Sequence, residues 1–371
     1  MVEVWTTGKC NLNCSYCFAV RKVPLDMTEE IAEATTQYLQ ETQVKKIEFY
    51  GGEPLLNMMP IKMMMGAHAQ NRQKRSRAIG ITTNGTLLKG DTLDWIRYHK
   101  ASVALSFDGS KASQDMNRGG TYRTVVRNAK RAMKLGVKIG VLKVMYPLET
   151  LFDDVAEIRS LGFKNVYLNI LKAYGFGYQL EDIPVFEEQY LRIIRELHNP
   201  PEFTVKDYES FAKMASRPLP LDHGCGIGRK GRTIGPDGYI YPCIDGPLLG
   251  QEYAMGSVWH GVDPVRERRI KQEAGKLNEK CLKCKFPCSP CNVVCFLHHG
   301  EFGVEPEEWF CQAIKAKYKA VSTIKPPPRS KTPPPVKTIK LEMKRLASPR
   351  GVDERQDGLH QGLRGGARDQ L

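Results

Sequence analysis

Three cysteines near the start of the chain could hold a metal centre. Cys10, Cys14 and Cys17 form a C-x3-C-x2-C pattern directly after the apolar stretch 2–5. Three thiolates so close together can bind three irons of a cubane iron–sulfur cluster, and the fourth iron then stays open to another ligand. A structural zinc knuckle is the alternative, but it needs a fourth Cys or His nearby, and residues 20–26 contain neither. The spacing therefore favours a cluster with an open iron, which implies chemistry.

Four short polar or glycine-containing motifs follow these cysteines in the chain. Their order and spacing, together with aromatic Tyr16 before the last cysteine, resemble the radical S-adenosylmethionine (radical SAM) family. The later motifs resemble those of members that carry a C-terminal SPASM domain, although Gln114 stands where they usually have a His. The resemblance covers residues 1 to about 315. The motifs are Gly51-Gly52-Glu53-Pro54, Thr82-Thr83-Asn84-Gly85, Ser106-Phe107-Asp108-Gly109 and Asp115-Met116-Asn117-Arg118.

The resemblance implies a SAM-binding [4Fe–4S] cluster held by Cys10, Cys14 and Cys17, with S-adenosyl-L-methionine (SAM) chelating the open iron. Clusters of this kind reach potentials as low as about −700 mV, so a reduced cluster can transfer an electron to the SAM sulfonium. The implied products are methionine and a 5′-deoxyadenosyl radical. That radical would abstract hydrogen from an unactivated position of a bound substrate.

The same resemblance implies which residues contact SAM. Gly51 and Gly52 let the backbone approach a ligand closely, and Pro54 fixes the chain as it leaves the strand. Arg118 is a candidate fork for the SAM carboxylate. Taken singly, the motifs have simpler explanations, such as a Gly-Gly turn, an Asn-Gly turn and a surface Asp/Arg pair on a helix. The implied SAM-contacting residues are Tyr16, Gly51, Gly52, Glu53, Pro54, Thr83, Asn84, Ser106, Asp108 and Arg118.

Eight more cysteines lie between residues 225 and 311, enough to fill two closed [4Fe–4S] clusters. The segment Gly238–Cys243 and the later spacing resemble a SPASM domain, except that Cys288 is additional and six residues separate Cys284 from Cys291 where the family has five. Two zinc ribbons are the alternative. The resemblance implies a first auxiliary cluster at Cys225, Cys243 and Cys295 and a second at Cys281, Cys284, Cys291 and Cys311. Cys288 could complete the first cluster, replace Cys291 or stay free.

Relatives with a SPASM domain modify peptides and proteins, so the resemblance implies a peptide or protein substrate. The first hypothesis is a maturase that installs a crosslink in a ribosomally made peptide. The alternatives are an anaerobic sulfatase-maturating enzyme, which forms formylglycine, and a non-catalytic zinc-binding scaffold. In the sulfatase-maturating relatives an Asp directly follows the G-x4-C cysteine and acts as a base. Here Ile244 intervenes, so Asp245 is a weak base candidate in an Asp-Gly-Pro segment that is also typical of a turn.

The implied chemistry needs partners. A flavodoxin- or ferredoxin-type protein is the expected electron donor. Many peptide-modifying relatives carry an N-terminal leader-binding domain, for which we expect no room in this chain. Substrate recognition would then come from a separate leader-peptide-binding protein, from residues 172–224 or from direct contact with the barrel.

Composition favours a cytoplasmic protein. No stretch approaches the roughly 20 apolar residues of a membrane span, and residues 1–6 lack the features of a signal peptide. In that compartment, eleven Cys are expected to be metal ligands and not disulfides. The net charge is +14, but the Pro/Gly-rich tail from Lys325 contributes +6, with eleven Lys/Arg against five Asp/Glu. We therefore expect a disordered tail, no basic patch on the folded part and no nucleic-acid partner.

Strand and helix patterns must position these motifs, and they alternate six times along residues 1–200. This alternation predicts an α/β fold, a partial (β/α)6 barrel of parallel strands followed by a small Cys-rich α+β auxiliary-cluster domain. The motifs would then gather at the carboxyl ends of the strands. The expected domains are the barrel (1–200), a linker (201–224), the auxiliary-cluster domain (225–318) and the tail (319–371). The expected strands are 2–6, 46–50, 78–82, 103–107, 138–145 and 165–170, and the expected helices are 28–42, 60–71, 92–99, 122–135, 151–161 and 185–197.

Overall fold

The computed structural model describes residues 1–17, 19, 24–70, 78–171, 178–215, 231–274, 279–284, 286 and 307–324. All of these belong to one compact unit, Met1–Pro327. None of the helices in the described part is both long and apolar enough to cross a membrane.

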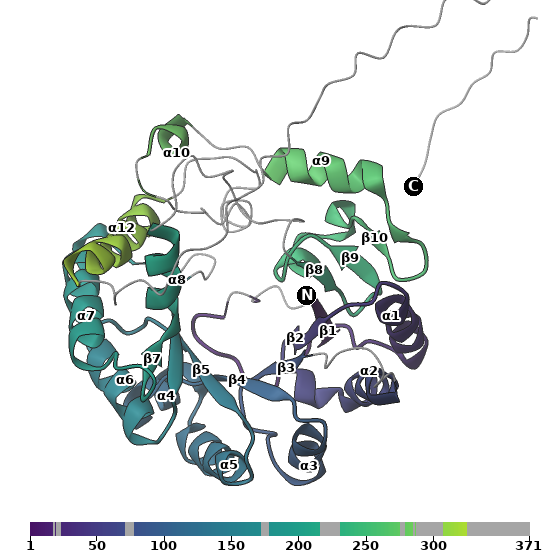
Figure 1. The fold of residues 1–371 in the computed structure, drawn as a ribbon, viewed down its shortest axis with the longest axis horizontal. Coiled ribbons are helices and arrows are strands. Elements are labelled where there is room, and N and C mark those ends of the chain that lie inside the picture. The colour runs from purple at the N-terminus through teal and green to yellow at the C-terminus, as the bar shows by residue number, and fades with distance from the viewer. Residues whose placement is uncertain are drawn as a thin grey trace, which may run out of the picture. The chain divides into compact units, whose positions relative to one another are not determined.

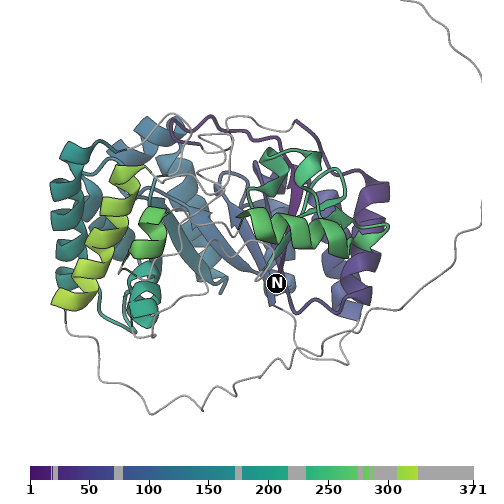
Figure 2. The same ribbon diagram turned by 90° about the horizontal axis from the view of Figure 1, so that it is seen from above.

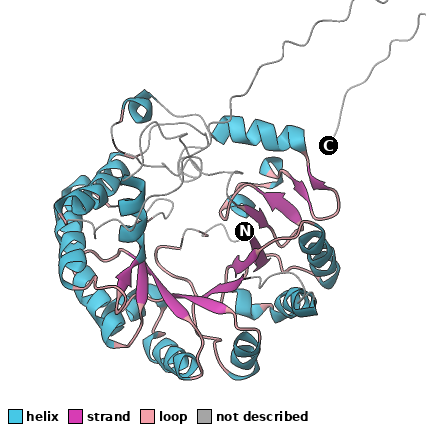
Figure 3. Cartoon of the chain, viewed as in Figure 1, coloured by secondary structure: helices cyan, strands magenta, loops and turns pink. Residues whose placement is uncertain are grey.

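Parallel strands follow one another across the sheet in chain order, from β1 to β7. The sheet curves around an interior, and helices cover its outer side (Figures 1 and 3). This confirms the predicted α/β class, and the six predicted strands agree with β1–β6 to within one residue at each end. The strands are β1 (Val2–Thr7), β2 (Lys46–Gly51), β3 (Ala78–Thr83), β4 (Ser102–Ser106), β5 (Ile139–Val144), β6 (Asn165–Asn169) and β7 (Thr204–Val205).

The six predicted helices are confirmed to within two residues at each end, and the structure adds others. Helices α4 and α8 were not predicted, and β7 and α8 lie within the segment 201–224 that was expected to be a linker. The helices of the barrel are α1 (Glu29–Glu41), α2 (Met58–Gln70), α3 (Gly90–Tyr98), α4 (Lys111–Arg118), α5 (Tyr122–Lys134), α6 (Leu151–Ser160), α7 (Ile183–Glu196) and α8 (Lys206–Ala215). Later in the chain come α9 (Pro264–Ala274), α10 (Glu279–Lys283) and α12 (Glu308–Thr323).

The core lies between the sheet and its outer helices. The strand register places one apolar side chain from each of β1–β5 in a row, and every member of this row is less than 9% exposed. Side chains alternate along a strand, so the neighbours of these residues face the interior of the barrel. The row consists of Val4, Phe49, Ile81, Val103 and Ile139.

The C-terminal part of the chain meets both edges of the barrel. On one edge, β8 (Arg232–Ile234) pairs in parallel with β1 and is followed by the antiparallel strands β9 (Tyr239–Tyr241), β10 (Gly256–Ser257) and β11 (Gly261–Val262). On the other edge, α12 packs against α7 and α8, as Figure 2 also shows.

A buried ion pair fixes α12 to the second edge. Lys317 Nζ lies 2.9 Å from Asp207 Oδ2 and donates to the Leu168 carbonyl at 2.7 Å, and both charged side chains are at most 2% exposed. Asp207 also accepts a hydrogen bond from the Tyr190 hydroxyl at 2.9 Å and one from the Leu168 amide at 3.1 Å. Strand β6, two barrel helices and α12 are therefore joined through one satisfied polar network.

Candidate functional site

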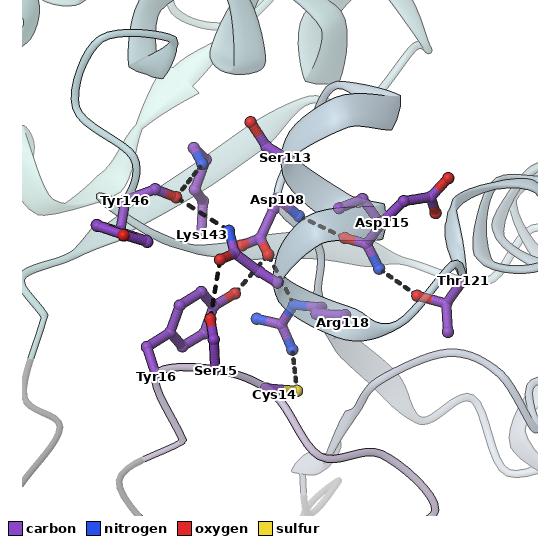
Figure 4. A network of polar contacts seen from close by, with 12 residues as sticks. Cys14, Ser15, Tyr16, Asp108, Ser113, Asp115, Arg118, Thr121, Lys143 and Tyr146 are labelled. Atoms are coloured by element: carbon purple, nitrogen blue, oxygen red, sulfur yellow. Dashed lines mark hydrogen bonds and ion pairs between the residues drawn. The ribbon is translucent and has the colours of Figure 1, made fainter. Parts of the chain in front are cut away.

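The cysteine loop leaves β1 and lies against the C-terminal end of α4. Within the loop, the Cys17 amide donates to the Cys14 carbonyl at 3.1 Å. The Ser15 amide and hydroxyl donate to the carbonyl and side-chain oxygens of Asn117 at 3.1 and 2.9 Å. Helix α4 thus holds the turn that carries the last two cysteines of the triplet (Figure 4).

The three thiols are electrostatic neighbours. Burial raises the pKa of Cys14, the nearby Arg118 charge lowers it, and the Cys17 and Cys10 thiols raise it again. Across the described residues, no three His, Cys, Asp or Glu side chains converge on a position for a single metal ion. The triplet therefore places three thiols on one short loop without forming a closed site for one ion.

Gly51 and Gly52 bring β2 against the start of the cysteine loop. The Gly52 amide donates to the Thr7 carbonyl at 2.9 Å, and the Glu53 amide donates to the Lys9 carbonyl at 2.8 Å. A Cβ on Gly51 would lie 2.2 Å from the Thr7 carbonyl oxygen, and one on Gly52 would lie 2.2 Å from that of Lys9. Side chains cannot be accommodated here, so the approach of the two loops requires glycine.

Glu53 connects the end of β2 to the end of β3. Its buried carboxylate accepts hydrogen bonds from the Thr83 hydroxyl at 2.7 Å, the Asn84 amide at 2.7 Å and the Leu55 amide at 3.1 Å. Burial raises the pKa of Glu53 to about 7, although these hydrogen bonds oppose the shift. Pro54 follows as the first residue of the 3-10 helix η1 (Pro54–Leu56). The Glu53 side chain therefore organises the loop, while a SAM contact of its carbonyl stays a prediction.

Asn84 ties the end of β3 to the first cysteine. Its Nδ2 donates to Asn11 Oδ1 at 2.9 Å and lies 3.9 Å from Cys10 Sγ. Asn11 Nδ2 in turn donates to the Thr86 hydroxyl at 2.8 Å. Hydrogen bonds from the side-chain amides of Asn84 and Asn11 thus join the turn after β3 to the cysteine loop.

Asp108, Tyr16 and Arg118 form the centre of the network in Figure 4. Asp108 Oδ2 accepts hydrogen bonds from the Tyr16 hydroxyl and from Arg118 Nε, the latter at 3.0 Å. Arg118 Nη1 lies 3.9 Å from Cys14 Sγ, and its guanidinium lies over the Tyr16 ring at 5.4 Å from the centroid. Burial and the Asp108 charge keep the pKa of Tyr16 well above its ordinary value, so Tyr16 stays a donor.

The other oxygen of Asp108 is available. Asp108 Oδ1 is buried and has no hydrogen-bond partner among the described residues. Gln114, which replaces the family's His, accepts from the Asp108 amide at 2.8 Å and donates to the Thr121 hydroxyl at 2.9 Å. Gln114 therefore fixes the Asp108 backbone, and a ligand can satisfy the carboxylate oxygen.

Sequence patterns missed a buried ion pair beneath this network. Lys143 Nζ lies 3.0 Å from Asp154 Oδ2, and both side chains are fully buried. Asp154 Oδ1 accepts from the Ser110 amide at 3.1 Å, and a Cβ on Gly109 would lie 2.2 Å from the Asp154 carbonyl oxygen. The pair thus fixes the loop that carries Asp108. A lysine inside the apolar strand Ile139–Val144 is the signal that could have revealed it.

Ser106 and Asp245 complete the predicted set. Ser106 ends β4, is half-buried, and its side chain makes no hydrogen bond within the described part of the chain. Asp245 precedes the 3-10 helix η3 (Gly246–Leu248). Burial raises the pKa of Tyr50 at the end of β2, and the charges of Asp245 and Cys17 raise it further. Asp245 therefore lies close enough to the cysteine loop and the barrel interior to share an electrostatic environment with them.

Part of the second cysteine group is also described. Cys281 and Cys284 flank a turn closed by a 3.2 Å backbone hydrogen bond, and burial followed by the nearby Cys281 thiol raises the pKa of Cys311. Lys280 and Glu308 form an ion pair of 2.5 Å between α10 and α12. Cys243 follows β9. The remaining predicted ligands, Cys225, Cys288, Cys291 and Cys295, lie outside the described residues.

The residues at the carboxyl ends of β1–β4 fit a SAM-bound iron–sulfur cluster. Three neighbouring thiols share one loop, the Gly51-Gly52 backbone packs against the start of that loop, and the buried acceptor Asp108 Oδ1 has no hydrogen-bond partner among the described residues. Cys10, Cys14 and Cys17 would hold the cluster.

Comparison with protein families and relatives agrees with this geometry. Residues 5–174 match the family model described as "Radical SAM superfamily". An uncharacterized protein of Archaeoglobus fulgidus is 26% identical over 79% of this chain and 74% of its own length. A probable GTP 3′,8-cyclase of the same organism is 25% identical over 66% of this chain and 85% of its own. The chain spans only 36% of another relative, the uncharacterized protein MJ0907 of Methanocaldococcus jannaschii, at 36% identity over 28% of this chain.

Solved structures share the fold over most of the chain. The structure of anSMEcpe with bound AdoMet and Kp18Cys peptide has a TM-score of 0.72 and 18% identity, and the match covers 87% of this chain and 96% of that one. Streptococcus suis SuiB bound to S-adenosylmethionine has a TM-score of 0.64 and 18% identity, with 82% and 76% covered. At this identity the likeness establishes the fold alone.

Proposed function

The chain contains a radical SAM domain at residues 5–174, and we propose that it is an enzyme that modifies a peptide or protein by hydrogen abstraction. One observation carries the proposal. The loop with Cys10, Cys14 and Cys17 is hydrogen-bonded to residues at the carboxyl ends of the neighbouring strands. At the same place, a buried carboxylate oxygen of Asp108 has no hydrogen-bond partner among the described residues and could bind a ligand.

When bound, the cluster and SAM supply one electron and a 5′-deoxyadenosyl radical that removes hydrogen from the substrate. The protein's own part is positioning. Glu53 holds the ends of β2 and β3 together, and the two glycines before it let the end of β2 pack directly against the start of the cysteine loop. Asp108 holds Tyr16 and Arg118, so the cysteine loop has one fixed orientation over the barrel interior.

A peptide substrate is supported by the solved structures with the same fold. Two of them contain a bound peptide, the Kp18Cys peptide in anSMEcpe and the precursor peptide SuiA in SuiB. We therefore propose crosslinking of a ribosomally made peptide, with recognition by the barrel or by a separate leader-peptide-binding protein.

Formylglycine formation is the second candidate, because Asp245 shares the environment of Tyr50 and Cys17. A carboxylate at this place could accept the proton released when a Cys or Ser is oxidised. The two candidates predict different products. Co-expression with a candidate precursor should give a peptide lighter by about 2 Da for a crosslink and also for formylglycine made from Ser, because the radical takes one hydrogen and the second leaves as a proton and an electron, which an auxiliary cluster would accept. Formylglycine made from Cys loses the sulfur as well and gives a larger mass change.

Tandem mass spectrometry separates the two products. A crosslink suppresses backbone fragments between the joined residues, whereas formylglycine leaves the fragment ladder intact and reacts with hydrazide. If formylglycine forms, Asp245→Asn should lose activity. A peptide of unchanged mass with every precursor and sulfatase tested would argue against both candidates.

Auxiliary clusters at the second cysteine group are part of the proposal. Cys281 and Cys311 lie near one another on α10 and α12, as ligands of one cluster would. Anaerobically reconstituted protein should hold about twelve irons, and the variant with Cys10, Cys14 and Cys17 all replaced by Ala about eight, at four irons per cubane. Zinc at residues 225–311 after expression with ample iron would favour the zinc-ribbon alternative.

A further inference from the structure

Helix α5 (Tyr122–Lys134) presents a continuous basic face to solvent, contrary to the expectation of no basic patch on the folded part. Each of its five cations is exposed, and within the described residues none of them forms an ion pair. Positions 123, 127, 130 and 134 are spaced by three or four residues, so they share one side of the helix. The basic face consists of Arg123, Arg127, Lys130, Arg131 and Lys134.

Only part of this charge pattern can be explained by the stability of the helix. Arg131 and Lys134 stand in the last turn of α5, where cations favour the helix dipole, but Arg123 stands in the first turn, where no acidic residue is found and a cation opposes the dipole. Like charges four residues apart, such as Arg127 and Arg131, destabilise a helix. Other exposed helices of the chain pair their charges, as Arg192 does with Glu196 in α7 and Lys271 with Glu267 in α9. The basic face of α5, whose cations form no ion pairs with the described residues, is therefore a candidate binding surface for an acidic partner molecule.

The acidic groups beside α5 are already engaged. Asp115 forms an ion pair of 2.6 Å with Lys111 and accepts from the Tyr122 amide at 2.9 Å. The hydrogen bond from Lys111 and the nearby charge of Arg123 both lower the pKa of Asp115, so Arg123 has Asp115 as an acidic neighbour. Glu157 accepts from the Tyr122 hydroxyl at 2.6 Å. The positive potential of the face is thus left for another molecule.

The buried face of α5 is linked to the cysteine loop by a chain of hydrogen bonds. Asn128 is buried and its Nδ2 donates to the carbonyls of Gly85 and Thr86 at 2.9 and 3.0 Å. The Thr86 hydroxyl accepts from Asn11 Nδ2 at 2.8 Å, and Asn11 directly follows Cys10. Helix α5 lies on the outer side of the sheet (Figure 1). A molecule bound to its exposed face would therefore be separated from the cysteine loop by this helix and one turn.

We propose that the basic face of α5 docks an acidic one-electron donor protein of the flavodoxin or ferredoxin class. This inference rests on the proposed function, because each reductive cleavage of SAM requires one electron. A single helix face suits the small interfaces of transient redox complexes. Charge complementarity raises the association rate of such complexes and makes them sensitive to salt.

The test measures 5′-deoxyadenosine formation by the holoenzyme with two reductants. One is flavodoxin kept reduced by ferredoxin–NADP reductase and NADPH, and the other is dithionite, which needs no docking site. Arg127→Glu with Lys130→Glu should lower the flavodoxin-driven rate about 10-fold at low ionic strength and leave the dithionite-driven rate unchanged. The matched control, Arg266→Glu with Arg268→Glu on exposed positions of α9, has the same charge change and should keep both rates.

A wild-type flavodoxin rate in the α5 variant, or an equal loss in the α9 control, would overturn the docking site. Absence of cleavage with dithionite in the wild type would instead contradict the proposed function. In that case calorimetric titration of flavodoxin into the holoenzyme still decides, since the α5 variant should bind it about 10-fold more weakly. Tighter binding of a short single-stranded RNA than of flavodoxin, lost in the α5 variant, would refute the proposal in favour of a nucleic-acid partner.

Discussion

Arg118 Nε lies 3.0 Å from Asp108 Oδ2, and both side chains are more than nine-tenths buried. The sequence indicates Arg118 as a fork for the SAM carboxylate, but the structure already uses one of its nitrogens to neutralise Asp108. The pair holds Tyr16 through the same carboxylate oxygen. Arg118 therefore positions the cysteine loop whether or not its remaining N–H groups also contact SAM.

Replacing one partner of this pair should destabilise the apoprotein. Arg118→Met leaves the Asp108 charge buried without its ion pair, and we expect a loss of about 3–5 kcal/mol in the free energy of unfolding. The double variant Arg118→Met with Asp108→Asn should recover part of that loss, because the charge is then gone. Urea unfolding of the three proteins measures this. A smaller loss of unfolding free energy in Arg118→Met than in the double variant would show that the two side chains do not form a stabilising buried ion pair.

Gly52→Ala should separate the cysteine loop from β2. The new Cβ would lie 2.2 Å from the Lys9 carbonyl oxygen, so the backbone must shift, at a cost of about 1–3 kcal/mol. We expect lower iron content after reconstitution, with the loss confined to the N-terminal cluster. Gly66→Ala in α2 is the control, because nothing lies within 4 Å of its Cβ position and alanine favours a helix by about 0.5–1 kcal/mol. Equal iron content in both variants would contradict the role of Gly52.

Glu53 should give the protein a distinctive pH dependence. Its pKa is about 7 in the folded protein and 4.5 as the reference, so between these values the native state binds more protons than the unfolded state. Stability contributed by this group therefore falls as pH rises through that window, by an amount on the order of 3 kcal/mol. Free energies of unfolding at pH 5.5 and 8 should differ less in Glu53→Gln than in the wild type. An identical pH dependence in both proteins would disprove the assignment.

Lys317→Met should weaken the docking of α12. The substitution leaves Asp207 buried without its ion pair and removes the donor to the Leu168 carbonyl, so we expect a loss of about 3–5 kcal/mol. The comparison is Lys280→Met, which removes the partly exposed ion pair with Glu308 and should cost about 0–1 kcal/mol. Thermal unfolding of the two variants shows whether Lys317→Met loses more stability than Lys280→Met. Similar effects would mean that the buried pair does not anchor the helix.

Sequence periodicity predicted the barrel well because its elements have apolar faces. Strands such as Lys46–Gly51 and helices such as Tyr122–Lys134 each bury a regular set of apolar side chains. Helix α4 escaped prediction because the side chains that it buries are polar: Ser113, Gln114, Asn117 and Arg118. No hydrophobic pattern marks such a helix, and it is the one that holds the cysteine loop.

The sequence motifs identified candidate residues for the site, but they could not predict the contacts between those residues. The motifs identified loops at the ends of two neighbouring strands, with Gly52 directly after β2 and Asn84 directly after β3, while their contacts with SAM stay predictions. That Glu53 ties together two strand ends, or that Lys143 and Asp154 fix the Asp108 loop, depends on contacts between segments far apart in the chain. Short strands such as Thr204–Val205 also carry too few residues to show a period.

Cleavage of SAM is the most direct test of the account. Anaerobically reconstituted protein, reduced with dithionite and given SAM, should form 5′-deoxyadenosine detectable by liquid chromatography with mass spectrometry, slowly even without substrate. Cys14→Ala should form none, because the cluster then lacks one of its three thiolates. Undiminished 5′-deoxyadenosine formation by Cys14→Ala, or none by the iron-loaded wild type, would contradict the assignment of the site.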